Sequence, residues 1–503
     1  MIQTDLIAPV GELLKRHAAK RPDKIAFSDA NTSTTYGRLA LTTANLAGHL
    51  QDMGIGVGTR VAILLPNSVA WIESCLAITR AGAVCVPIAY DAAAAEISYR
   101  LTDSETQLVI TTDERAGHAA GLATILVSRG TTQEAGTRYA DLIDTLPKSL
   151  PRDPEAIDET AYIIYTSGTT GRAKGVLLSV HGMLWVTAAC WAPIAGLCEA
   201  DTVLSPLPLF HSYALNLSVL SVLAVGASEY IMEKYSSSEA ARLLATGRFT
   251  VMPGVPTMFH YLLETAKQDG TIKGLRLCIS AGAIMTASLN RSFEEHFGVK
   301  LLDGYGITET STMVTLNWPV GTRIMGSCGL PVPGVTTRIV DPVSGRDLEP
   351  GVEGELIVRG PLLMKGYHNK PAETASAIRD GWYHTGDLAK SDKNGYLTIT
   401  GRLKELIIRG GQNIAPGEIE EAVSGFSGVL DCAAVGIPHE HLGEVPVIFV
   451  VPHSGVSIDH QALIDHCRTQ LSGYKVPHAI HVVEVIPRTG SGKVMRFKLR
   501  ALL

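Results

Sequence analysis

Apolar residues recur along the first part of the chain in two spacings, and these two spacings alternate. Runs of consecutive apolar or β-branched residues predict buried strands at Arg60–Leu65, Ala83–Ile88 and Gln107–Thr111. Helical spacing predicts helices at Pro9–Ala19 and Ser68–Ala81. Because strands that alternate with helices usually form a parallel sheet with helices on its faces, this part of the chain predicts an α/β fold.

The same alternation continues to about residue 310, with further strands predicted at Thr202–Ser205, Phe249–Pro253 and Leu275–Ser280. From about residue 320 the pattern changes to short strands separated by Gly, Pro and Asp turns, with no long helix between them. This texture predicts a β-barrel or β-rich subdomain at about 320–400. Its expected strands are Val335–Asp341, Gly354–Val358 and Tyr396–Thr400.

The last roughly 90 residues predict a separate C-terminal domain of mixed helices and strands. We expect helices at 416–426 and 459–471, and strands at 431–436, 446–451 and 479–485. A second domain agrees with the length of 503 residues, because single cores rarely grow beyond about 250–300 residues.

Composition excludes several classes of protein. The chain is 46% hydrophobic and 18% charged, which is typical of a globular protein, and its net charge of −6 gives no electrostatic case for nucleic acid or an anionic membrane. The longest apolar stretch, Ala214–Ala227, is too short to span a bilayer. The eight cysteines lack zinc or redox spacing, and the N-terminus does not resemble a secretory signal. We therefore expect reduced thiols and a cytoplasmic location.

The strongest chemical motif is the run Tyr165–Gly175 (YTSGTTGRAKG), which follows the apolar stretch Ala161–Ile164. A strand that ends in a Gly/Ser/Thr loop presents backbone N–H groups and hydroxyls to an anion, and glycines let the backbone approach closely. Lys174 adds a positive charge. The spacing differs from that of the Walker loop. The motif predicts a site for a di- or triphosphate, and the alternative is a flexible turn.

Four other segments carry residues suited to binding, although each has an ordinary structural alternative. The run Asp303–Glu309 (DGYGITE) has glycines that let a flat base lie against the backbone, an aromatic ring, and a carboxylate that could bind Mg²⁺. The alternative interpretation is a tight turn. The aspartate of Tyr383–Asp387 can accept hydrogen bonds from ribose hydroxyls, and the alternative is an ordinary Gly-Asp turn. The loop Arg488–Lys493 has two glycines and a serine that make it mobile, with a lysine at its tip, and the alternative is a solvated turn. His211 lies in Pro208–Tyr213 (PLFHSY), where a histidine is more often a core or capping residue.

Together these segments resemble the adenylate-forming superfamily of acyl-CoA synthetases, firefly luciferases and peptide-synthetase adenylation domains, over nearly the whole chain. The motifs occur in the order of that family: 166–174, 210–211, 304–309, 387, 401–405 and 493. The resemblance implies a large N-terminal domain (1–400) of two α/β subdomains plus a β-barrel. It also implies a hinge at 401–404 and a small mobile α+β C-terminal domain (405–503).

The implied reaction has two steps and uses ATP, Mg²⁺ and coenzyme A. A carboxylate first attacks the α-phosphate of ATP to give an acyl adenylate and pyrophosphate, and the thiol of coenzyme A then displaces AMP. Two alternatives stay open: transfer to the phosphopantetheine of a carrier protein, and a non-catalytic nucleotide-binding relative. A homodimer is also left open.

The acid is expected to be a fatty or aromatic monocarboxylate. The segment FHSYALNLSVL resembles the 4-coumarate–CoA ligase and luciferase branch, and Asp303 replaces the basic residue expected for a dicarboxylate such as malonate. The segment Gly410–Asn413 is closer to bacterial acyl-CoA synthetases than to the plant ligases.

The resemblance also assigns roles to individual residues. Catalysis is carried over to Lys493, His211, Thr308 and Glu309, with Glu309 also holding Mg²⁺. The β- and γ-phosphates are assigned to Thr166, Ser167, Gly168, Thr169, Thr170 and Lys174. Adenine is assigned to Ala283, Gly304, Tyr305 and Gly306, and ribose to Asp387 and Arg402. Coenzyme A is assigned to Gly410, Gly411, Tyr474 and Lys475, and the hinge to Lys404. The acyl pocket is assigned to Trp185, Ser212, Tyr213 and Gly282, with Val255 and Met313 nearby.

Overall fold

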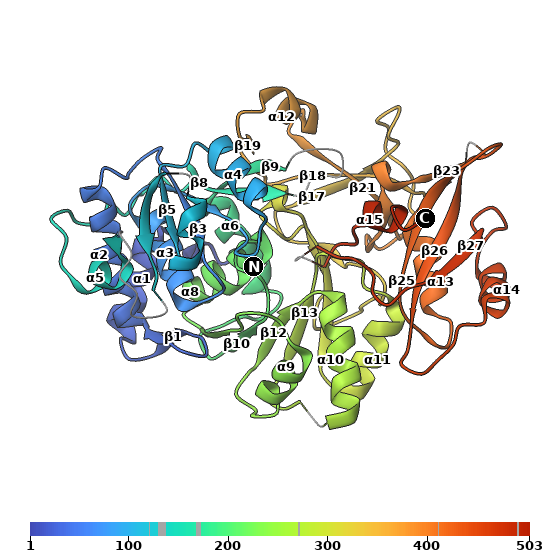
Figure 1. Cartoon of the computed structure of the whole chain (residues 1–503), viewed down its shortest axis with the longest axis horizontal. Coiled ribbons are helices and arrows are strands. Elements are labelled where there is room, and N and C mark those ends of the chain that lie inside the picture. The colour runs from blue at the N-terminus through green and yellow to red at the C-terminus, as the bar shows by residue number, and fades with distance from the viewer. Residues whose placement is uncertain (120, 129–136, 167–172, 270–271, 411, 490–491) are drawn as a thin grey trace.

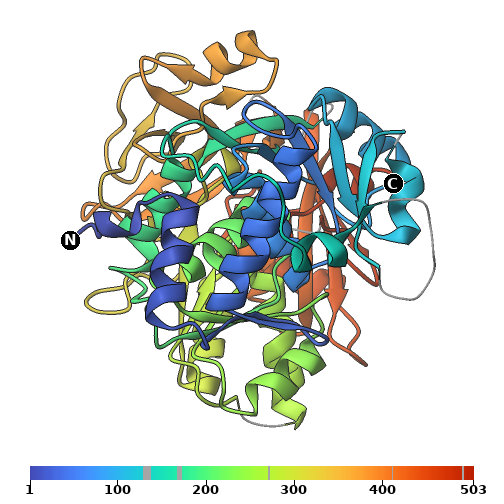
Figure 2. The ribbon, with the colours of Figure 1, turned by 90° about the vertical axis from the view of Figure 1, so that its left-hand side faces the viewer.

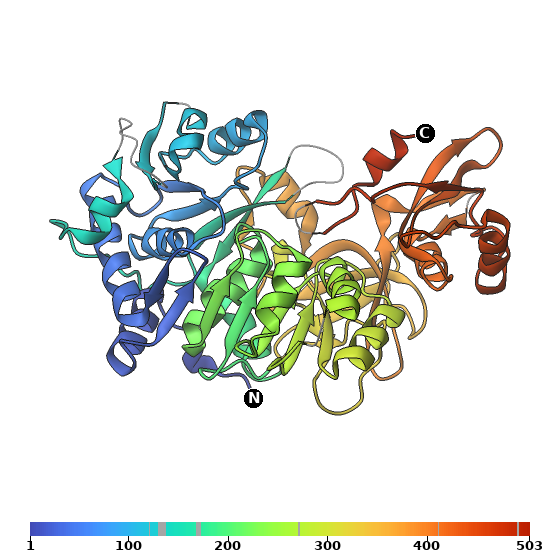
Figure 3. The ribbon, with the colours of Figure 1, turned by 60° about the horizontal axis from the view of Figure 1, so that its bottom comes forward.

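The computed structural model describes residues 1–119, 121–128, 137–166, 173–269, 272–410, 412–489 and 492–503. The first segments of the chain, in blue, lie at one end of the molecule, the green and yellow segments lie in the middle, and the C-terminal part, in red, lies at the opposite end (Figures 1 and 3). Figure 2 looks onto the N-terminal helices, with strands of the C-terminal part behind them.

One large sheet contains the strands that carry the adenine motif. Its inner strands are parallel, and strands from distant parts of the sequence meet in it, since Phe27 pairs with Glu229. The strand order is β16 (Leu330–Pro331), β15 (Thr315–Leu316), β14 (Lys300–Tyr305), β13 (Leu277–Ser280), β12 (Val251–Gly254), β10 (Thr202–Ser205), β11 (Ser228–Ile231), β1 (Ile25–Ser28) and β2 (Ser33–Thr35).

The second large sheet carries the phosphate motif. It is parallel except at β9, which pairs antiparallel with both β8 and β19. The strand order is β19 (Gly366–Tyr367), β9 (Lys174–Ser179), β8 (Thr160–Thr166), β4 (Val84–Pro87), β3 (Arg60–Leu64), β5 (Leu108–Thr111), β6 (Ala123–Leu126) and β7 (Thr137–Arg138).

Helices pack around these sheets, and the main apolar core draws residues from both sheets. Its largest fully buried side chains include Trp71, Trp191, Tyr36 and Tyr162. Burying one large apolar side chain contributes about 1.5–3 kcal/mol, so this core stabilises the two sheets as a unit. The helices are α1 (Val10–Lys20), α2 (Tyr36–Asp52), α3 (Val69–Arg80), α4 (Ala94–Asp103), α5 (Tyr139–Asp144), α6 (Val180–Val186), α7 (Ser212–Ala214), α8 (Val222–Val225), α9 (Ser237–Leu244), α10 (Pro256–Asp269) and α11 (Ala287–Phe297).

A smaller sheet follows, and it accounts for the β-rich texture predicted beyond residue 320. Its strands pair antiparallel, and a single short helix, α12 (Pro371–Ala377), interrupts the described part of this region. The strands are β17 (Thr336–Val340), β18 (Gly354–Arg359), β20 (Ile378–Arg379), β21 (Trp382–Ser391) and β22 (Leu397–Arg402).

The C-terminal α+β domain begins after a short turn of 3₁₀ helix, Leu403–Glu405. Its long hairpin of β25 (Val429–His439) and β26 (Gly443–Pro452) is flanked by β23 (Ile407–Arg409), β24 (Gln412–Ile414) and β27 (Ala479–Val482). The helices of this domain are α13 (Pro416–Ser424), α14 (His460–Gln470) and α15 (Arg496–Arg500).

The predicted α/β fold with a small α+β C-terminal domain is confirmed, and most predicted elements shift by only a few residues. The predicted helix at Ser68–Ala81 is α3, which Ser68 caps by accepting a hydrogen bond from the amide of Trp71. The hairpin of β8 and β9 was not predicted, because the pattern indicated parallel strands throughout. No helix among the described residues combines the length and apolarity needed to cross a membrane.

Candidate active site

A cavity of about 520 Å³ lies where the carboxyl ends of β12, β13 and β14 meet the C-terminal domain. Clefts at this edge of a parallel sheet are the usual ligand sites of α/β proteins. Helix α13, strand β22 and the loop before α15 complete the wall. The predicted site residues that line this cavity are Gly282, Ala283, Gly304, Tyr305, Gly306, Asp387, Arg402 and Lys493.

Asp387 is the best-connected carboxylate of the cavity. The hydroxyl of Tyr305 donates a hydrogen bond to its Oδ2 at 2.5 Å, and Arg402 Nε lies 2.8 Å from its Oδ1. Asp387 and Arg402 are direct partners across the β21–β22 ladder, so the strand register places the ion pair. Burial raises the pKa of Tyr305, and the carboxylate of Asp387 raises it further. The aspartate is therefore held in one orientation, with its charge paired.

Lys493 reaches this cavity from the C-terminal domain. Burial lowers the pKa of its ammonium group, and the charge of Arg402 lowers it further, whereas the carboxylates of Asp387, Glu309 and Glu405 act in the opposite direction. The loop that carries it touches the N-terminal domain at Gly492, where a Cβ would lie 3.1 Å from a methyl of Val255. Gly492 also has φ of +82°, which favours glycine.

Glu309 belongs to a second group of predicted residues, which does not line the 520 Å³ cavity. It lies in a 3₁₀ turn, Thr308–Thr310, and accepts a hydrogen bond from the hydroxyl of Tyr367 at 3.0 Å. The ammonium of Lys174 lies 4.8 Å from the centre of the Tyr367 ring. Thr166 is the cross-strand partner of Lys174. Ser167, Gly168, Thr169 and Thr170 lie outside the described residues.

The predicted acyl-pocket residues Ser212 and Tyr213 begin α7. The hydroxyls of Ser212 and Thr308 lie 3.2 Å apart, and Tyr213 donates a hydrogen bond to the carbonyl of Ile279 at 3.1 Å. The Tyr213 ring stacks on that of Trp191 with centres 6.2 Å apart.

His211 precedes α7 and packs against Phe210, with ring centres 4.2 Å apart. Burial lowers the pKa of His211 to about 3, and the positive charges of Lys493 and Arg100 contribute. The imidazole is therefore neutral near pH 7, which leaves it one donor and one acceptor.

Trp185, which the sequence assigns to the acyl pocket, does not line the 520 Å³ cavity. Its ring lies against Gly334, where a Cβ would come within 2.6 Å of Cζ2. Neither Trp185 nor the group around His211, Thr308 and Glu309 lines that cavity. The role of Trp185 in an acyl pocket stays a prediction.

Of the residues assigned to coenzyme A, the described ones, Gly410, Tyr474 and Lys475, lie on the C-terminal domain outside the cavity. Gly410 donates its amide to the carbonyl of Leu442 at 2.7 Å, and Gly411 lies outside the described residues. Arg409 donates to the carbonyl of Tyr474 at 2.6 Å, and Lys475 forms an ion pair with Glu418. Lys404, the assigned hinge, is exposed.

Two features of the cavity have no ligand contact assigned to them by the sequence. Asp303 lines the wall, is buried, and has an Oδ1 with no partner among the described residues. Burial raises the pKa of this carboxyl well above its usual range. Arg488 and Arg496, which flank Lys493, also line the cavity. Arg488 belongs to the predicted lysine loop Arg488–Lys493, whereas Arg496 lies three residues beyond it and carried no signal for a role.

Comparison with known proteins agrees with this geometry. Residues 14–368 match the AMP-binding enzyme family, and residues 418–493 match the AMP-binding enzyme C-terminal domain. A feruloyl-CoA synthase of Amycolatopsis sp. is 35% identical over 487 residues, covering 96% of this chain and 97% of the relative. A long-chain-fatty-acid–CoA ligase of Bacillus subtilis (strain 168) is 31% identical over 526 residues, covering 97% and 93%.

Among solved structures, ATP-bound MatB from Rhodopseudomonas palustris superposes with a TM-score of 0.88 and 32% identity, covering 98% of each chain. Both matched ranges contribute residues to the cavity wall, and Asp387 and Arg402 lie in the segment between them. This chain belongs to the AMP-binding, adenylate-forming family and to its branch of AMP-forming acid–CoA ligases.

Proposed function

We propose that this protein is an acyl-CoA synthetase that activates a fatty or aromatic monocarboxylic acid to an acyl adenylate and then transfers the acyl group to coenzyme A. The observation that carries the proposal is the position of Lys493, a residue of the C-terminal domain, in one cavity with Asp387, Arg402 and Tyr305. A mobile cation beside a fixed carboxylate suits the union of two anions, the acid and the α-phosphate of ATP.

In the first step, the nucleoside of ATP would bind at the carboxyl end of β14. The carboxylate of Asp387 has lone pairs beyond those used by Tyr305 and Arg402, and these can accept from ribose hydroxyls. The backbone at Ala283, Gly304 and Gly306 would face the adenine ring. Asp303 lines the same wall, and its carboxyl would accept from the exocyclic amine of adenine.

The phosphates would extend from there toward the β8–β9 turn. Lys174 and Thr166, with residues 167–170, would hold the β- and γ-phosphates, and Thr308 the α-phosphate. Glu309 is a suitable ligand for Mg²⁺, which binds hard oxygen donors and usually only one or two carboxylates. When bound, Mg²⁺ neutralises phosphate oxygens.

The reacting oxygens meet at Lys493. The carboxylate oxygen of the acid forms a bond to the α-phosphorus, and the bond from that phosphorus to the pyrophosphate oxygen breaks. Charge accumulates on the phosphate oxygens in this step, and the ammonium of Lys493 would stabilise it. The neutral His211 would contact the acid without adding a competing charge.

In the second step, we expect the C-terminal domain to turn about Lys404 and to withdraw Lys493. Gly410, Gly411, Tyr474 and Lys475 would then line the channel for coenzyme A. Its thiolate attacks the acyl carbonyl, and the carbon–oxygen bond to AMP breaks. Gly410, Tyr474 and Lys475, the described members of this set, lie outside the present cavity, which supports the proposed division between two poses.

The choice of acid rests on the relatives and on the apolar surroundings of α7. The feruloyl-CoA synthase relative supports an aromatic acid, and the long-chain-fatty-acid–CoA ligase relative supports an aliphatic one. Tyr213, Trp191, Val255 and Met313 provide apolar surface near the start of that helix. Burying each CH₂ group contributes about 0.8 kcal/mol, so chain length will affect selectivity strongly.

A panel of acids tests the proposal. Pyrophosphate release is measured with ferulate, benzoate, decanoate, hexadecanoate and malonate, each with and without coenzyme A. We expect thioester from an aromatic or fatty acid and none from malonate. Adenylate that accumulates and reacts only with a carrier-protein phosphopantetheine would instead support the alternative acceptor. Release of no pyrophosphate with any acid would refute the proposed activity.

A further inference from the structure

The described residues around Lys493 are joined to one another by backbone hydrogen bonds. The amide of Thr489 donates to the carbonyl of Lys493 at 2.8 Å, and the amide of Gly492 donates back to the carbonyl of Thr489 at 2.8 Å. Arg488 and Val494 form an isolated bridge at its base. These bonds join the described residues on the two sides of Lys493's segment, so the position of the lysine depends on how the base at Arg488 and Val494 is attached to the rest of the domain.

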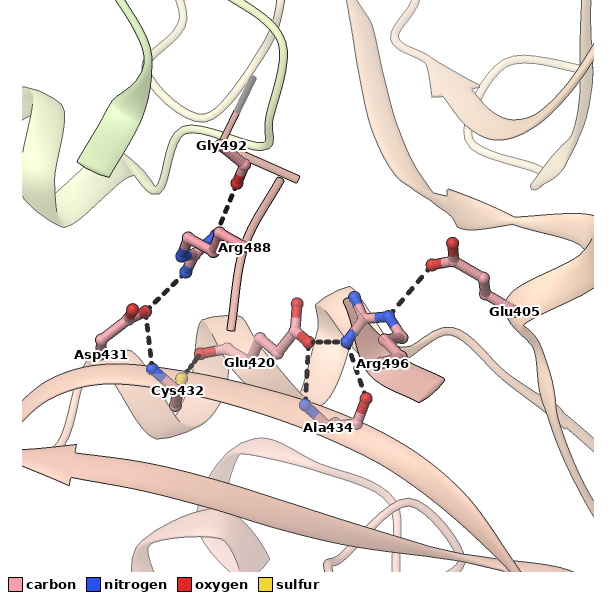
Figure 4. Close-up of polar contacts among 8 residues, drawn as sticks. All are labelled: Glu405, Glu420, Asp431, Cys432, Ala434, Arg488, Gly492 and Arg496. Carbon is pink, nitrogen blue, oxygen red and sulfur yellow. Dashed lines mark hydrogen bonds and ion pairs between the residues drawn. The ribbon is translucent and has the colours of Figure 1, made fainter. Parts of the chain in front are cut away.

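Two arginines make that attachment, one on each side of Lys493 (Figure 4). Arg488 donates to the carbonyl of Gly492 at 3.0 Å and to Asp431 Oδ1 at 2.8 Å. Asp431 Oδ1 also accepts from the amide of Cys432 at 2.9 Å. The first side of the loop is thereby tied to β25.

Arg496 makes the wider set of contacts on the other side (Figure 4). Its Nε donates to Glu405 Oε2 at 3.0 Å, and its NH1 donates to Glu420 Oε1 at 2.5 Å and to the carbonyl of Ala434 at 2.7 Å. Glu420 Oε1 is itself held by the amide of Ala434 at 2.9 Å. One side chain therefore links the lysine loop to α13, to β25 and to the 3₁₀ turn that contains Lys404.

Charge, partial burial and donor geometry all stabilise the contacts of Arg496. Burial lowers the pKa of Arg496, but the carboxylates of Glu420 and Glu405 outweigh this effect and raise it, so the guanidinium stays charged. Its side chain is 17% exposed, against 27% for Glu405 and 19% for Glu420. A planar guanidinium can serve several acceptors in fixed directions, which the ammonium of a lysine cannot do.

We propose that Arg496 is a positioning residue for adenylate formation, and that its contact with Glu405 sets the position of Lys493 relative to the hinge. The proposal rests on the proposed function and extends it, since the turn at 403–405 gains a role in placing the lysine as well as in rotation. The two carboxylates have different roles. Glu420 binds the arginine within the C-terminal domain, and Glu405 binds it to the 3₁₀ turn at 403–405.

The test compares the two half-reactions in Glu405→Gln, using ferulate or decanoate, whichever the wild-type protein activates better. This substitution leaves the contacts of Arg496 with Glu420 and Ala434 in place. We expect adenylate formation to slow by about tenfold, because displacement of a reacting group by about 1 Å can cost up to about 100-fold. Conversion of a supplied acyl adenylate to thioester should stay within about twofold of wild type, since Lys493 is not used in that step.

A matched control and a second variant separate positioning from general damage. Asp465→Asn breaks an ion pair of 2.6 Å with Arg468 in the same domain, on α14, and should leave both half-reactions unchanged. Arg496→Lys keeps the charge but loses the branched donors, and should slow adenylate formation at least as much as Glu405→Gln. Equal loss of both half-reactions in Glu405→Gln, or wild-type adenylate formation, would overturn the positioning role while the proposed function stands. A wild-type protein that adenylates no acid would overturn both.

Discussion

Tyr305 and Asp387 are joined by a hydrogen bond of 2.5 Å between groups that lie 82 positions apart in the sequence. Tyr305 ends β14 of a large sheet, and Asp387 lies in β21 of the smaller sheet, so this bond crosses from one sheet to the other. The aspartate is 3% exposed, and its other oxygen is paired with Arg402. The proposed ribose acceptor is therefore oriented from two sides before any nucleotide binds.

Replacing Tyr305 with phenylalanine tests this orientation. The ring would stay, but a buried carboxylate oxygen would lose its donor, which typically costs about 1–3 kcal/mol of stability. We expect the KM for ATP to rise by about threefold to tenfold, with a smaller change in kcat, because the aspartate is less well fixed in the free enzyme. Steady-state kinetics with varied ATP measure this effect.

The control is Tyr396→Phe, which removes an exposed tyrosine hydroxyl bonded to the carbonyl of Thr322, outside the cavity. Its KM for ATP should equal that of the wild-type protein. An unchanged KM in Tyr305→Phe would show that Arg402 alone orients the aspartate.

Lys493→Ala should separate the two half-reactions. Without the ammonium group, adenylate formation should fall by about 100-fold or more, since one fixed donor at a developing charge is worth that much. A supplied acyl adenylate should still be converted to thioester. Pyrophosphate–ATP exchange reports the first step, and thioester formation reports the second.

Lys498→Ala is the matched control for that variant, because Lys498 is an exposed residue of α15 a few positions along the same segment. It should behave as wild type in both assays. Equal losses in both half-reactions of Lys493→Ala would contradict a lysine that acts only before the domain turns.

How much of this site can be predicted from sequence depends on whether the contact is local. The motif around Lys174 and the order of the motifs were sufficient to predict the family and the fold. The pairing of Asp387 with Arg402 depends on strand register, and the approach of Lys493 depends on the pose of a separate domain. Neither relationship is encoded in residue spacing.

For Trp185 and Arg496 as well, the sequence does not indicate which residues lie beside the side chain. Five of the seven residues of α6 are buried, and these do not include Trp185. Periodicity could therefore not indicate which neighbour the indole faces, and the ring lies against Gly334. Arg496 has no role in the sequence-based assignment, because nothing in the sequence places Glu405, Glu420 and Ala434 beside one another.

The lowered pKa of His211 predicts a pH dependence of stability. A histidine with a folded pKa of about 3 takes up a proton more readily when the chain is unfolded, where the value is near 6.5. Stability should therefore fall as the pH drops below about 6.5, by up to about 1.4 kcal/mol per pH unit for this one group, and should show no such loss above it. His211→Gln removes this contribution.

Urea unfolding at pH 5 and pH 7.5 measures the difference. The loss of stability on acidification should be smaller in His211→Gln than in the wild-type protein. His296→Gln changes an exposed histidine of α11 and should retain the wild-type pH dependence. An identical loss in all three proteins would mean that His211 is protonated in the folded state.

Lys390 and Glu418 form an ion pair of 3.7 Å between β21 and α13, on opposite sides of the proposed hinge. Glu418 also pairs with Lys475, one of the residues assigned to coenzyme A. Turning the C-terminal domain about Lys404 would separate Lys390 from Glu418, so the pair favours the adenylating pose. Because the side chains are 40% and 23% exposed, we expect a contribution of at most about 1 kcal/mol.

Lys390→Gln should therefore lower the rate ratio of adenylate formation to thioester formation by up to about fivefold, the population change that such an energy allows. The effect of added salt on this ratio should shrink in the variant, because salt screens an exposed pair. Arg338→Gln breaks an ion pair with Asp347 within one part of the molecule and should leave the ratio unchanged. A ratio equal to that of the wild-type protein at low and high salt would mean that this pair does not bias the domain.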